Sequence, residues 1–379
     1  MAAKQSGAKP TSKETSVVYF ASAKVERLQG DATLPAKFTR LLKEFDLGSW
    51  LAKKVVAIKM HVGGGVGYTT IHPLFVRRLV DVVKEAGGRP FVTDGGWPMG
   101  AATARGYTPE VIGCPVLPAA GATEKYFYAK PVNYHTLKVL EICGNVADAD
   151  ALINFSHVKG HGDCGFGGAC KNLAMGAVTT RTRRTLHALE GGHAWEAERC
   201  THCGACVRAC PTGALRFDDK GKFSIFYHHC VYCQHCAVAC PVRAIKVDAS
   251  HYQRFQEGLA LATEKVLGFF ARDAVLHINV LTNITYLCDC WGLSTMALVP
   301  DVGILASRDI VAVEHASLAK IRTRDLNRDA IPAGRKLHRG KHLFEKLHGK
   351  DPYVQIRALE RRGLGTVSYT HLTLPTNRE

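Results

Sequence analysis

Eight of the fourteen cysteines stand in two short blocks whose spacing suits binding of a metal or a cluster by thiolates. The blocks are CTHCGACVRACP and CVYCQHCAVACP, and each reads CxxCxxCxxxCP. Zinc sites normally pair two CxxC units across a gap, and disulfides do not suit a cytoplasmic chain. The pattern therefore favours iron–sulfur clusters, with the ligands Cys200, Cys203, Cys206, Cys210, Cys230, Cys233, Cys236 and Cys240.

The repeated run resembles that of bacterial two-cluster ferredoxins, in which the fourth cysteine of each run ligates the other cluster. The blocks align at an offset of 30 residues and also share Ala209/Ala239 and Ala214/Ala244, which indicates an internal duplication. The resemblance covers residues 196–248 and implies two [4Fe–4S] clusters that carry electrons one at a time. It implies cluster 1 on Cys200, Cys203, Cys206 and Cys240, and cluster 2 on Cys230, Cys233, Cys236 and Cys210.

The chain around these blocks has the pattern of an α/β protein. Residues 54–60 form an apolar strand run, 73–86 an amphipathic helix that begins with proline, and 90–94 a second strand. A strand, a helix and a strand within about forty residues predict a right-handed parallel unit. Further strands are expected at 151–157, 276–285 and 309–313, and further helices near 182–190, 252–270 and 315–321.

The expected fold class is α/β, with a parallel-sheet domain interrupted by an inserted α+β two-cluster ferredoxin-like domain. Short strands at residues 214–217, 223–226 and 244–247 belong to the insertion. The expected segments are a flexible arm at 1–16, the first part of the α/β domain at 17–195, the ferredoxin-like domain at 196–248, the second part of the α/β domain at 249–321, a basic helical C-terminal segment at 322–366, and a tail at 367–379 that is not native.

Four expected strands run into unusual loops, and ligands of open parallel sheets bind beyond the carboxyl ends of the strands. The loops read HVGGGVGYTT, DGGWPMG, HVKGHGDCGFGGACKN and CDCWG. We expect all four to face one crevice, where glycine-rich backbone can cradle an anion. Gly160, Gly162 and Gly165 spell GxGxxG, but the loop continues where a helix should begin, which argues against a dinucleotide site.

Three strings carry a family resemblance over about residues 50–320. They are KMHVGGGVGYTTIHPLFVR, SHVKGHGDCGFGGACKNLAMG and CDCWGLSTMALVPDVGILASRDIVAVEHASL. Together they resemble the domain of unknown function family 362. The resemblance implies an iron–sulfur protein whose motif loops sit on an α/β scaffold, and it leaves the reaction open.

The third loop and the helix after it supply further candidate residues. Their spacing is also similar to that of the lactate racemase family, which uses a nickel-pincer cofactor. That resemblance implies that His161 serves as acid or base, Lys171 anchors the cofactor and His187 ligates nickel. The alternative is that these side chains form hydrogen bonds within a packed loop. The catalytic candidates are His157, His161 and Lys171, and the cofactor-binding candidates are Lys159, Lys171 and Asn172.

The sequence CDC places two thiols one residue apart. A disulfide across one residue is usually strained, whereas an extended CxC directs both side chains to the same face and can bind a soft metal. A structural role is the alternative. The candidate second metal site comprises His161, His187, Cys288 and Cys290.

The formal charge of +16 favours an anionic partner. The basic residues between 322 and 341 accompany no nucleic-acid module, so we read a solvated basic face and expect no nucleic acid. No run of eighteen apolar residues and no signal peptide is apparent, which predicts a cytoplasmic protein without a membrane.

The leading hypothesis is an iron–sulfur protein that acts in electron transfer or as an oxidoreductase, with a second ligand or metal site in the α/β crevice. It would use a redox partner protein and a small anionic substrate. One alternative is a ferredoxin-like carrier or partner-binding module without catalysis. The other is a non-redox metal enzyme of the hydroxy-acid isomerase type with structural clusters, so whether the chain is an enzyme stays open.

Overall fold

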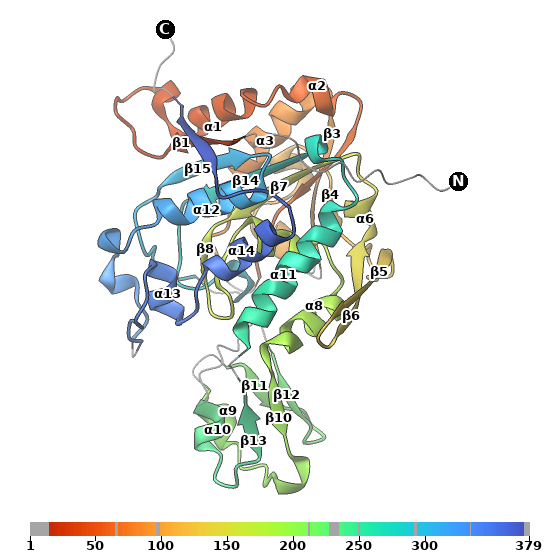
Figure 1. Ribbon diagram of the computed structural model, residues 1–379, viewed down its shortest axis with the longest axis vertical. Coiled ribbons are helices and arrows are strands. Elements are labelled where there is room, and N and C mark those ends of the chain that lie inside the picture. Colours follow the sequence, from red (N-terminus) through yellow and green to blue (C-terminus); the bar gives the residue numbers. More distant parts are fainter. Residues whose placement is uncertain are drawn as a thin grey trace.

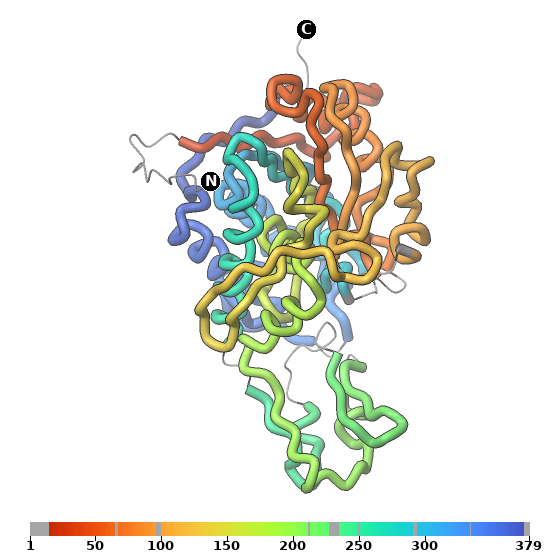
Figure 2. Tube along the Cα trace, turned by 90° about the vertical axis from the view of Figure 1, so that its right-hand side faces the viewer, coloured from red at the N-terminus to blue at the C-terminus, as the bar shows by residue number. Residues whose placement is uncertain are grey.

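The computed structural model consists of an α/β body and a small cysteine-rich lobe that extends from one end of it (Figure 1). Helix α8 (Thr180–His187) precedes the lobe and α11 (Tyr252–Leu267) follows it. The side view in Figure 2 shows the lobe attached to the body by these two segments of the chain. The structure describes residues 15–64, 67–95, 99–210, 213–226, 235–248, 251–291, 294–333 and 335–374.

The body is built on an eight-stranded sheet with the order β16-β1-β15-β14-β7-β2-β3-β4. The strands β4, β3, β2, β7 and β14 are parallel, whereas β15 is antiparallel to both of its neighbours and β16 is parallel to β1. The sheet is therefore mostly parallel, as expected. Its strands are β1 (Ser16–Ser22), β2 (Val55–Lys59), β3 (Arg89–Asp94), β4 (Val116–Pro118), β7 (Ala151–His157), β14 (Val275–Leu281), β15 (Gly303–Ser307) and β16 (Tyr369–Thr373).

Helices cover both faces of the sheet, and each face has its own apolar core (Figure 1). Leu276, Ile278 and Val280 of β14 face one core, and Val275 and Leu281 face the other, because side chains alternate along a strand. The first core contains α1 (Leu34–Lys43), α2 (Leu47–Leu51), α3 (Pro73–Glu85) and α5 (Pro109–Ile112). The second contains α7 (Ala169–Gly176), α11, α12 (Ile310–Lys320) and α14 (Tyr353–Arg361).

Shorter elements complete the body. Two hairpins, β5 (Phe127–Tyr134) with β6 (Leu137–Cys143) and β8 (Lys159–His161) with β9 (Gly165–Gly167), lie outside the main sheet. The remaining helices of the body are α4 (Met99–Thr103), α6 (Gly144–Ala147) and α13 (Leu343–His348). The 3₁₀ turns are η1 (Gly30–Ala32), η2 (Ala188–Glu190), η3 (Ala197–Arg199), η4 (Arg272–Ala274), η5 (Asp289–Trp291), η6 (Thr323–Asp325) and η7 (Arg328–Ala330).

Local sequence explains both the correct and the wrong element predictions. The strand expected at residues 309–313 is wrong, because Asp309 accepts hydrogen bonds from the backbone N–H groups of Val311 and Ala312 and so caps helix α12. This helix is buried on almost every side, so its apolar run has no amphipathic period that could identify it as a helix. The strand expected at 276–285 ends at Leu281.

The lobe contains two antiparallel ribbons and two short helices. Strand β10 (His193–Trp195) pairs with β13 (Ile245–Val247), and β11 (Leu215–Phe217) pairs with β12 (Phe223–Ile225). The three short strands expected in this region are confirmed. The helices are α9 (Ala205–Arg208) and α10 (His235–Ala239), and the small core between these elements includes Cys206 and Cys236.

Part of the stretch expected to be a non-native tail, 367–379, forms a strand of the main sheet. Strand β16 pairs with β1 along the sheet edge from Ser16↔Tyr369 to Phe20↔Thr373, and so supplies partners for an otherwise open strand. That this stretch is not native stays a prediction. Residues 1–14 of the expected arm lie outside the described residues. Across the part of the chain that the structure describes, none of the helices combines the length and the apolar character that crossing a membrane requires.

Candidate functional site

The loops beyond β2, β3, β7 and β14 line one crevice with a cavity of about 50 Å³. This confirms, for the described residues, that the four unusual loops face one space. Most of the polar side chains around it are buried. The polar and sulfur-containing lining residues are Lys59, His61, Asp94, His157, Lys159, Lys171, Asn172, Met175, Arg183, Cys288 and Cys290.

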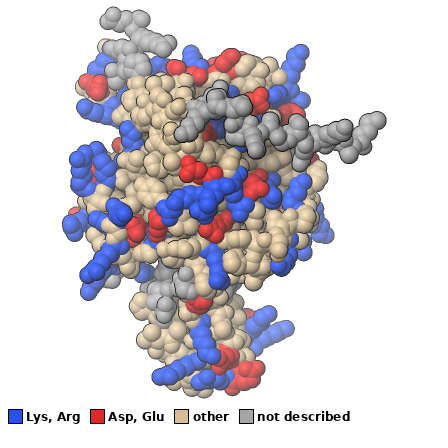
Figure 3. Space-filling model, in the orientation of Figure 1, with Lys and Arg blue, Asp and Glu red and all other residues tan. Residues whose placement is uncertain are grey.

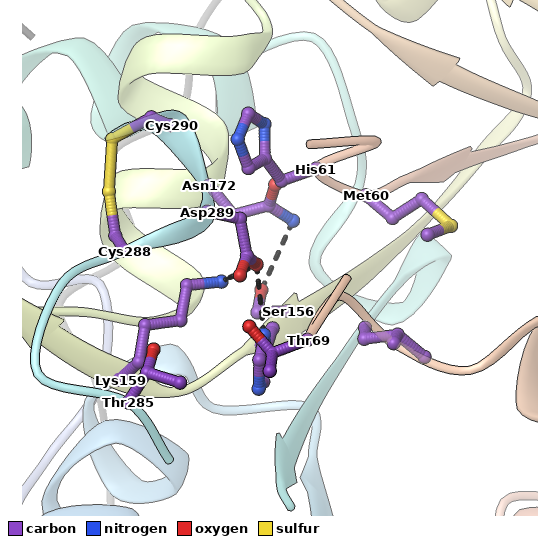
Figure 4. A network of polar contacts seen from close by, with 12 residues as sticks. Met60, His61, Thr69, Ser156, Lys159, Asn172, Thr285, Cys288, Asp289 and Cys290 are labelled. Atoms are coloured by element: carbon purple, nitrogen blue, oxygen red, sulfur yellow. Dashed lines mark hydrogen bonds and ion pairs between the residues drawn. A yellow bond between two sulfur atoms is a disulfide. The ribbon is translucent and has the colours of Figure 1, made fainter. Parts of the chain in front are cut away.

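Two aspartates each bridge a lysine and a histidine at this site. Asp94 lies 3.0 Å from Lys59 Nζ and 2.8 Å from His61 Nδ1. Asp289 lies 2.5 Å from Lys159 Nζ and 2.9 Å from His157 Nδ1. The paired residues flank the ends of β2 and β7 in opposite order, as K-x-H and H-x-K, and Figure 4 shows Lys159 pointing toward Asp289.

These pairs determine the charge of the aspartates. Burial by itself raises the pKa of Asp94 and of Asp289, but the neighbouring lysine and histidine outweigh it and hold both pKa values well below their usual range. Burial lowers the pKa of Lys59 and of Lys159, and the aspartates oppose that shift. Both aspartates are therefore ionised at neutral pH, and each compensates a buried lysine.

His157 positions Asp289. Its Nδ1 lies 2.9 Å from the Asp289 carboxylate and its Nε2 lies 2.7 Å from the Thr282 carbonyl oxygen. Both ring nitrogens are thus engaged with protein oxygens, and His157 joins Asp289 to the end of β14. The catalytic role expected for His157 stays a prediction.

Lys171 has a different environment from the two paired lysines. It is 9% exposed, and its ammonium group lies 3.9 Å from Cys290 Sγ. Among the described residues, no carboxylate oxygen lies within 4.0 Å of this group. Burial lowers the pKa of Lys171. The crevice therefore contains a buried lysine without an ion-pair partner in the described part of the chain.

Asn172 lies next to Lys171 on α7 and holds the crevice wall together. Its side-chain oxygen accepts a hydrogen bond from Lys59 Nζ at 2.6 Å. Its amide nitrogen donates to Asn154 Oδ1 at 2.7 Å and to the Lys59 carbonyl oxygen at 2.9 Å. The polar atoms of the Asn172 side chain are thus hydrogen-bonded to neighbouring protein groups. The ammonium group of Lys159, the other cofactor-binding candidate outside Lys171, is likewise paired with Asp289.

His161, Cys288 and Cys290 form the first of two groups that can hold a metal, with ligand atoms within 4.8 Å of one another. The two cysteines are joined as a disulfide, contrary to the expectation for a CxC pair (Figure 4). His161 Nδ1 accepts from the backbone N–H of Asp163, and its Nε2 lies 3.7 Å from Cys290 Sγ. Metal binding by both sulfur atoms requires the reduced dithiol, because thiolates are the ligands.

The second group contains His187, which the sequence analysis assigned to the cysteine site. In the structure His187 lies with Asp163 and Glu190, and its Nδ1 is 2.8 Å from Glu190 Oε1. Burial and the Glu190 charge raise the pKa of Asp163 to about 8, and burial raises that of Glu190 to about 8. Burial lowers the pKa of His187 to about 4. The expected four-residue site is therefore divided between two groups.

The cysteine-rich lobe brings residues of both sequence blocks together around one cavity. Its walls include the side chains Cys200, Cys203, Cys206 and Cys240. Cys240 Sγ accepts a hydrogen bond from the Ala244 N–H, and Cys210 Sγ accepts one from the Ala214 N–H, both at 3.2 Å. Cys236 is buried, whereas Cys230 and Cys233 lie outside the described residues.

The excess of basic residues is spread over the surface. Figure 3 shows Lys and Arg interleaved with Asp and Glu on the face presented there. In the C-terminal segment Arg322 pairs with Asp325, and Arg357 pairs with Asp351. This distribution suits the interpretation of a solvated basic face.

The chain belongs to the protein family described as Domain of unknown function (DUF362), which matches residues 56–319. Among solved structures it is similar to the lactate racemase apoprotein from Thermoanaerobacterium thermosaccharolyticum, with 12% sequence identity and a TM-score of 0.33. The similarity covers 70% of this chain and 51% of that one, so the chain spans about half the length of that protein. No curated protein matches the chain.

Sequence reasoning missed several of the side chains in the crevice. Lys59, His61, Asp94, Arg183 and Asp289 were not singled out, although four of them lie in or beside the loops expected to face the crevice. The K-x-H spacing at the end of β2 mirrors the H-x-K spacing at the end of β7, and this signal could have identified Lys59 and His61. Arg183 comes from α8, where no sequence signal indicates the crevice.

Proposed function

We propose that the protein is an iron–sulfur enzyme that binds a small organic anion in the crevice between the four loops. The observation that carries this proposal is Lys171, a buried ammonium group that has no carboxylate within 4.0 Å among the described residues. Leaving a buried cation unpaired is costly, whereas a bound carboxylate or phosphate would compensate it. Lys171 is thus the anion anchor.

The other groups that line the crevice reinforce the preference for an anion. Four Lys or Arg side chains contribute to the lining, and Asp94 is the acidic residue among the described lining residues. Arg183 is also buried, donates to the Gly95 carbonyl oxygen at 3.1 Å and pairs with Glu124 at 3.8 Å. The small cavity suits an anion of a few non-hydrogen atoms. We therefore favour a short-chain carboxylate such as a hydroxy acid.

The lobe would hold two [4Fe–4S] clusters. Four thiols from both sequence blocks surround one cavity, and this donor set fits cluster 1 on Cys200, Cys203, Cys206 and Cys240. The N–H groups that point at Cys210 and Cys240 fit sulfur atoms that carry negative charge. Cluster 2 would use Cys210 and Cys236 together with Cys230 and Cys233. When bound, the clusters supply one-electron transfer, for which a redox partner protein is needed.

Within the crevice this chain's own residues bind and orient the anion. Lys171 would anchor its carboxylate, while Lys59 and Lys159 remain paired with their aspartates. His161 Nδ1 accepts from the Asp163 N–H, and its Nε2 lies 3.7 Å from Cys290 Sγ at the crevice. We infer that His161 serves there as the acid or base.

The grouping of His161, Cys288 and Cys290 supports a second candidate function, a non-redox metal enzyme of the hydroxy-acid isomerase type with structural clusters. A metal at this group would supply Lewis-acid chemistry once the disulfide is reduced. The two functions share the anion site and differ in the role of the clusters. Turnover of a hydroxy acid that does not depend on the reduction state of the clusters would favour the isomerase.

Protein purified without oxygen provides the first test. Iron and acid-labile sulfide near eight atoms each per chain are expected, since each cluster contains four of each. Isothermal titration with lactate enantiomers and inorganic phosphate then tests the crevice, and Lys171→Met is expected to weaken binding of whichever anion binds. An absence of iron and sulfide would contradict the cluster assignment. Clusters without binding of any of these anions would instead favour the carrier.

A further inference from the structure

A second site lies apart from the cysteines of the crevice, among side chains that are buried almost completely. Asp163 is 0% exposed, and neither of its carboxylate oxygens has a hydrogen-bond partner among the described residues. Its nearest charged contacts are His187 Nδ1 at 3.8 Å and His161 Nδ1 at 3.9 Å, both beyond hydrogen-bond distance. A buried carboxylate without donors is unfavourable unless a proton or a cation neutralises it.

A second carboxylate lies beside Asp163, which makes the environment more unfavourable. Glu190 is also buried, and ligand atoms of Asp163, His187 and Glu190 all lie within 4.8 Å of one another. Lys350 and Lys171 are the nearby positive groups, but Lys350 donates to the Gly162 carbonyl oxygen and Lys171 faces Cys290. Neither lysine forms an ion pair with these carboxylates in the described structure.

We propose that Asp163, His187 and Glu190 bind one divalent cation. Two carboxylates and one imidazole form a donor set of oxygen and nitrogen, which suits Mn²⁺, Fe²⁺ or Zn²⁺. His187 Nδ1 lies 3.8 Å from Asp163 Oδ2 and 2.8 Å from Glu190 Oε1, and both separations are shorter than the ~4.2 Å that two ligands at about 2.1 Å from one ion can span. The cation would supply the partner that both Asp163 oxygens lack. None of these three residues is assigned to the proposed anion site or to the clusters.

The position of these residues suggests what the cation does. Asp163 lies in the turn that joins β8 to β9, and His161 is the last residue of β8. His187 ends α8, and Glu190 ends η2, three residues before the first lobe strand β10 begins. A cation on these three residues would therefore fix the crevice loop to the segment that enters the lobe.

Mn²⁺ binding to the full-length protein, purified without oxygen and freed of divalent metal, tests the proposal. The EPR signal of free Mn²⁺ is lost on binding, so a titration gives the number and the affinity of sites. One site is expected in the wild type, with at least tenfold weaker binding in Asp163→Asn and Glu190→Gln. Mn²⁺ should also raise the melting temperature of the wild type but not of Glu190→Gln.

Two control variants separate this site from its surroundings. Glu314→Gln changes another buried glutamate, which accepts from the Cys170 N–H and belongs to neither metal group, so Mn²⁺ binding should be unchanged. Cys290→Ser alters the cysteine group, and it too should leave Mn²⁺ binding unchanged. The iron and sulfide contents of Glu190→Gln should match those of the wild type, which keeps this test separate from that of the cluster assignment.

Two results would overturn the proposal. The first is a wild-type protein that binds no Mn²⁺ under these conditions. The second is Mn²⁺ binding that persists unchanged in Glu190→Gln, because this substitution replaces one proposed carboxylate ligand with an amide of nearly the same shape. Should Asp163→Asn fail to fold, the Glu190→Gln titration decides the question alone.

Discussion

Replacing Lys159 with methionine should destabilise the protein, whereas the same replacement at Lys171 should not. Lys159 is 2.5 Å from Asp289, whereas Lys171 has no carboxylate within 4.0 Å among the described residues. Methionine retains the unbranched apolar stem of lysine and removes the charge. The two substitutions therefore make the same chemical change in the same crevice and differ in what each leaves behind.

The expected magnitudes follow from these contacts. Lys159→Met leaves the buried Asp289 with His157 as its remaining charged partner, and breaking a buried pair costs about 3–5 kcal/mol. Because His157 stays in place, we expect a loss of about 3 kcal/mol. Lys171→Met removes a buried charge that lacks a partner, so the free energy of unfolding should stay the same or rise by about 1 kcal/mol. Anion affinity should nevertheless fall roughly 10- to 150-fold, the equivalent of one charge-assisted hydrogen bond.

Urea unfolding followed by tryptophan fluorescence measures the first quantity, and isothermal titration with the bound anion measures the second. Lys138→Met, a substitution of an exposed lysine on strand β6, is the control for both. The reasoning would be refuted if Lys171→Met destabilised the protein by as much as Lys159→Met, since Lys171 would then have a partner in the folded protein. Unchanged anion affinity in Lys171→Met would refute its role as the anchor.

Three further predictions concern other parts of the chain. Burial lowers the pKa of His277 from 6.5 to about 3. Between these two pH values the unfolded chain binds a proton that the folded chain does not, so the free energy of unfolding should fall by about 1.4 kcal/mol per pH unit below pH 6.5. His277→Gln should flatten this fall, measured as the urea midpoint over that range. Asp309→Ala removes the acceptor of two N–H groups at the start of α12 and should lower the free energy of unfolding by about 2 kcal/mol, whereas an unchanged urea midpoint would contradict the cap. Cys240→Ser should reduce iron from about eight to about four atoms per chain by removing cluster 1, and retention of all the iron would exclude the crossed ligand assignment.

The parallel part of the fold could be predicted because its signals are local. Residues 54–94 contain an apolar strand, a helix begun by Pro73 and a second strand, and each is defined by neighbours in sequence. Helix α12 could not be recognised in the same way, since burial on almost all sides removes the helical period from its sequence. The pairing of β16 with β1 joins residues from opposite ends of the chain, and no local pattern indicates it.

The crevice could be predicted as a place but not as a set of contacts. The rule that ligands bind beyond the carboxyl ends of parallel strands correctly brought four loops together. The pairing of Lys159 with Asp289 spans 130 residues, and the spacing of neither residue predicts it. The structure groups His187 with Asp163 and Glu190 instead of the cysteines, because the direction in which the end of α8 points depends on how that helix packs.

The number of lysines in the crevice therefore does not identify the residue that binds a substrate. Three lysines line it, and two of them are already compensated by aspartates, Asp94 at the end of β3 and Asp289 in the turn η5. Arg183 also lines the crevice, and it forms an ion pair with Glu124 at 3.8 Å. The unmatched positive charge among the described lining residues is therefore that of Lys171. Because a buried cation attracts an anion most strongly when no protein carboxylate competes for it, the carboxylates determine where the anion binds. The same principle applies with the opposite sign at Asp163, where an unpaired buried carboxylate determines where a cation would bind.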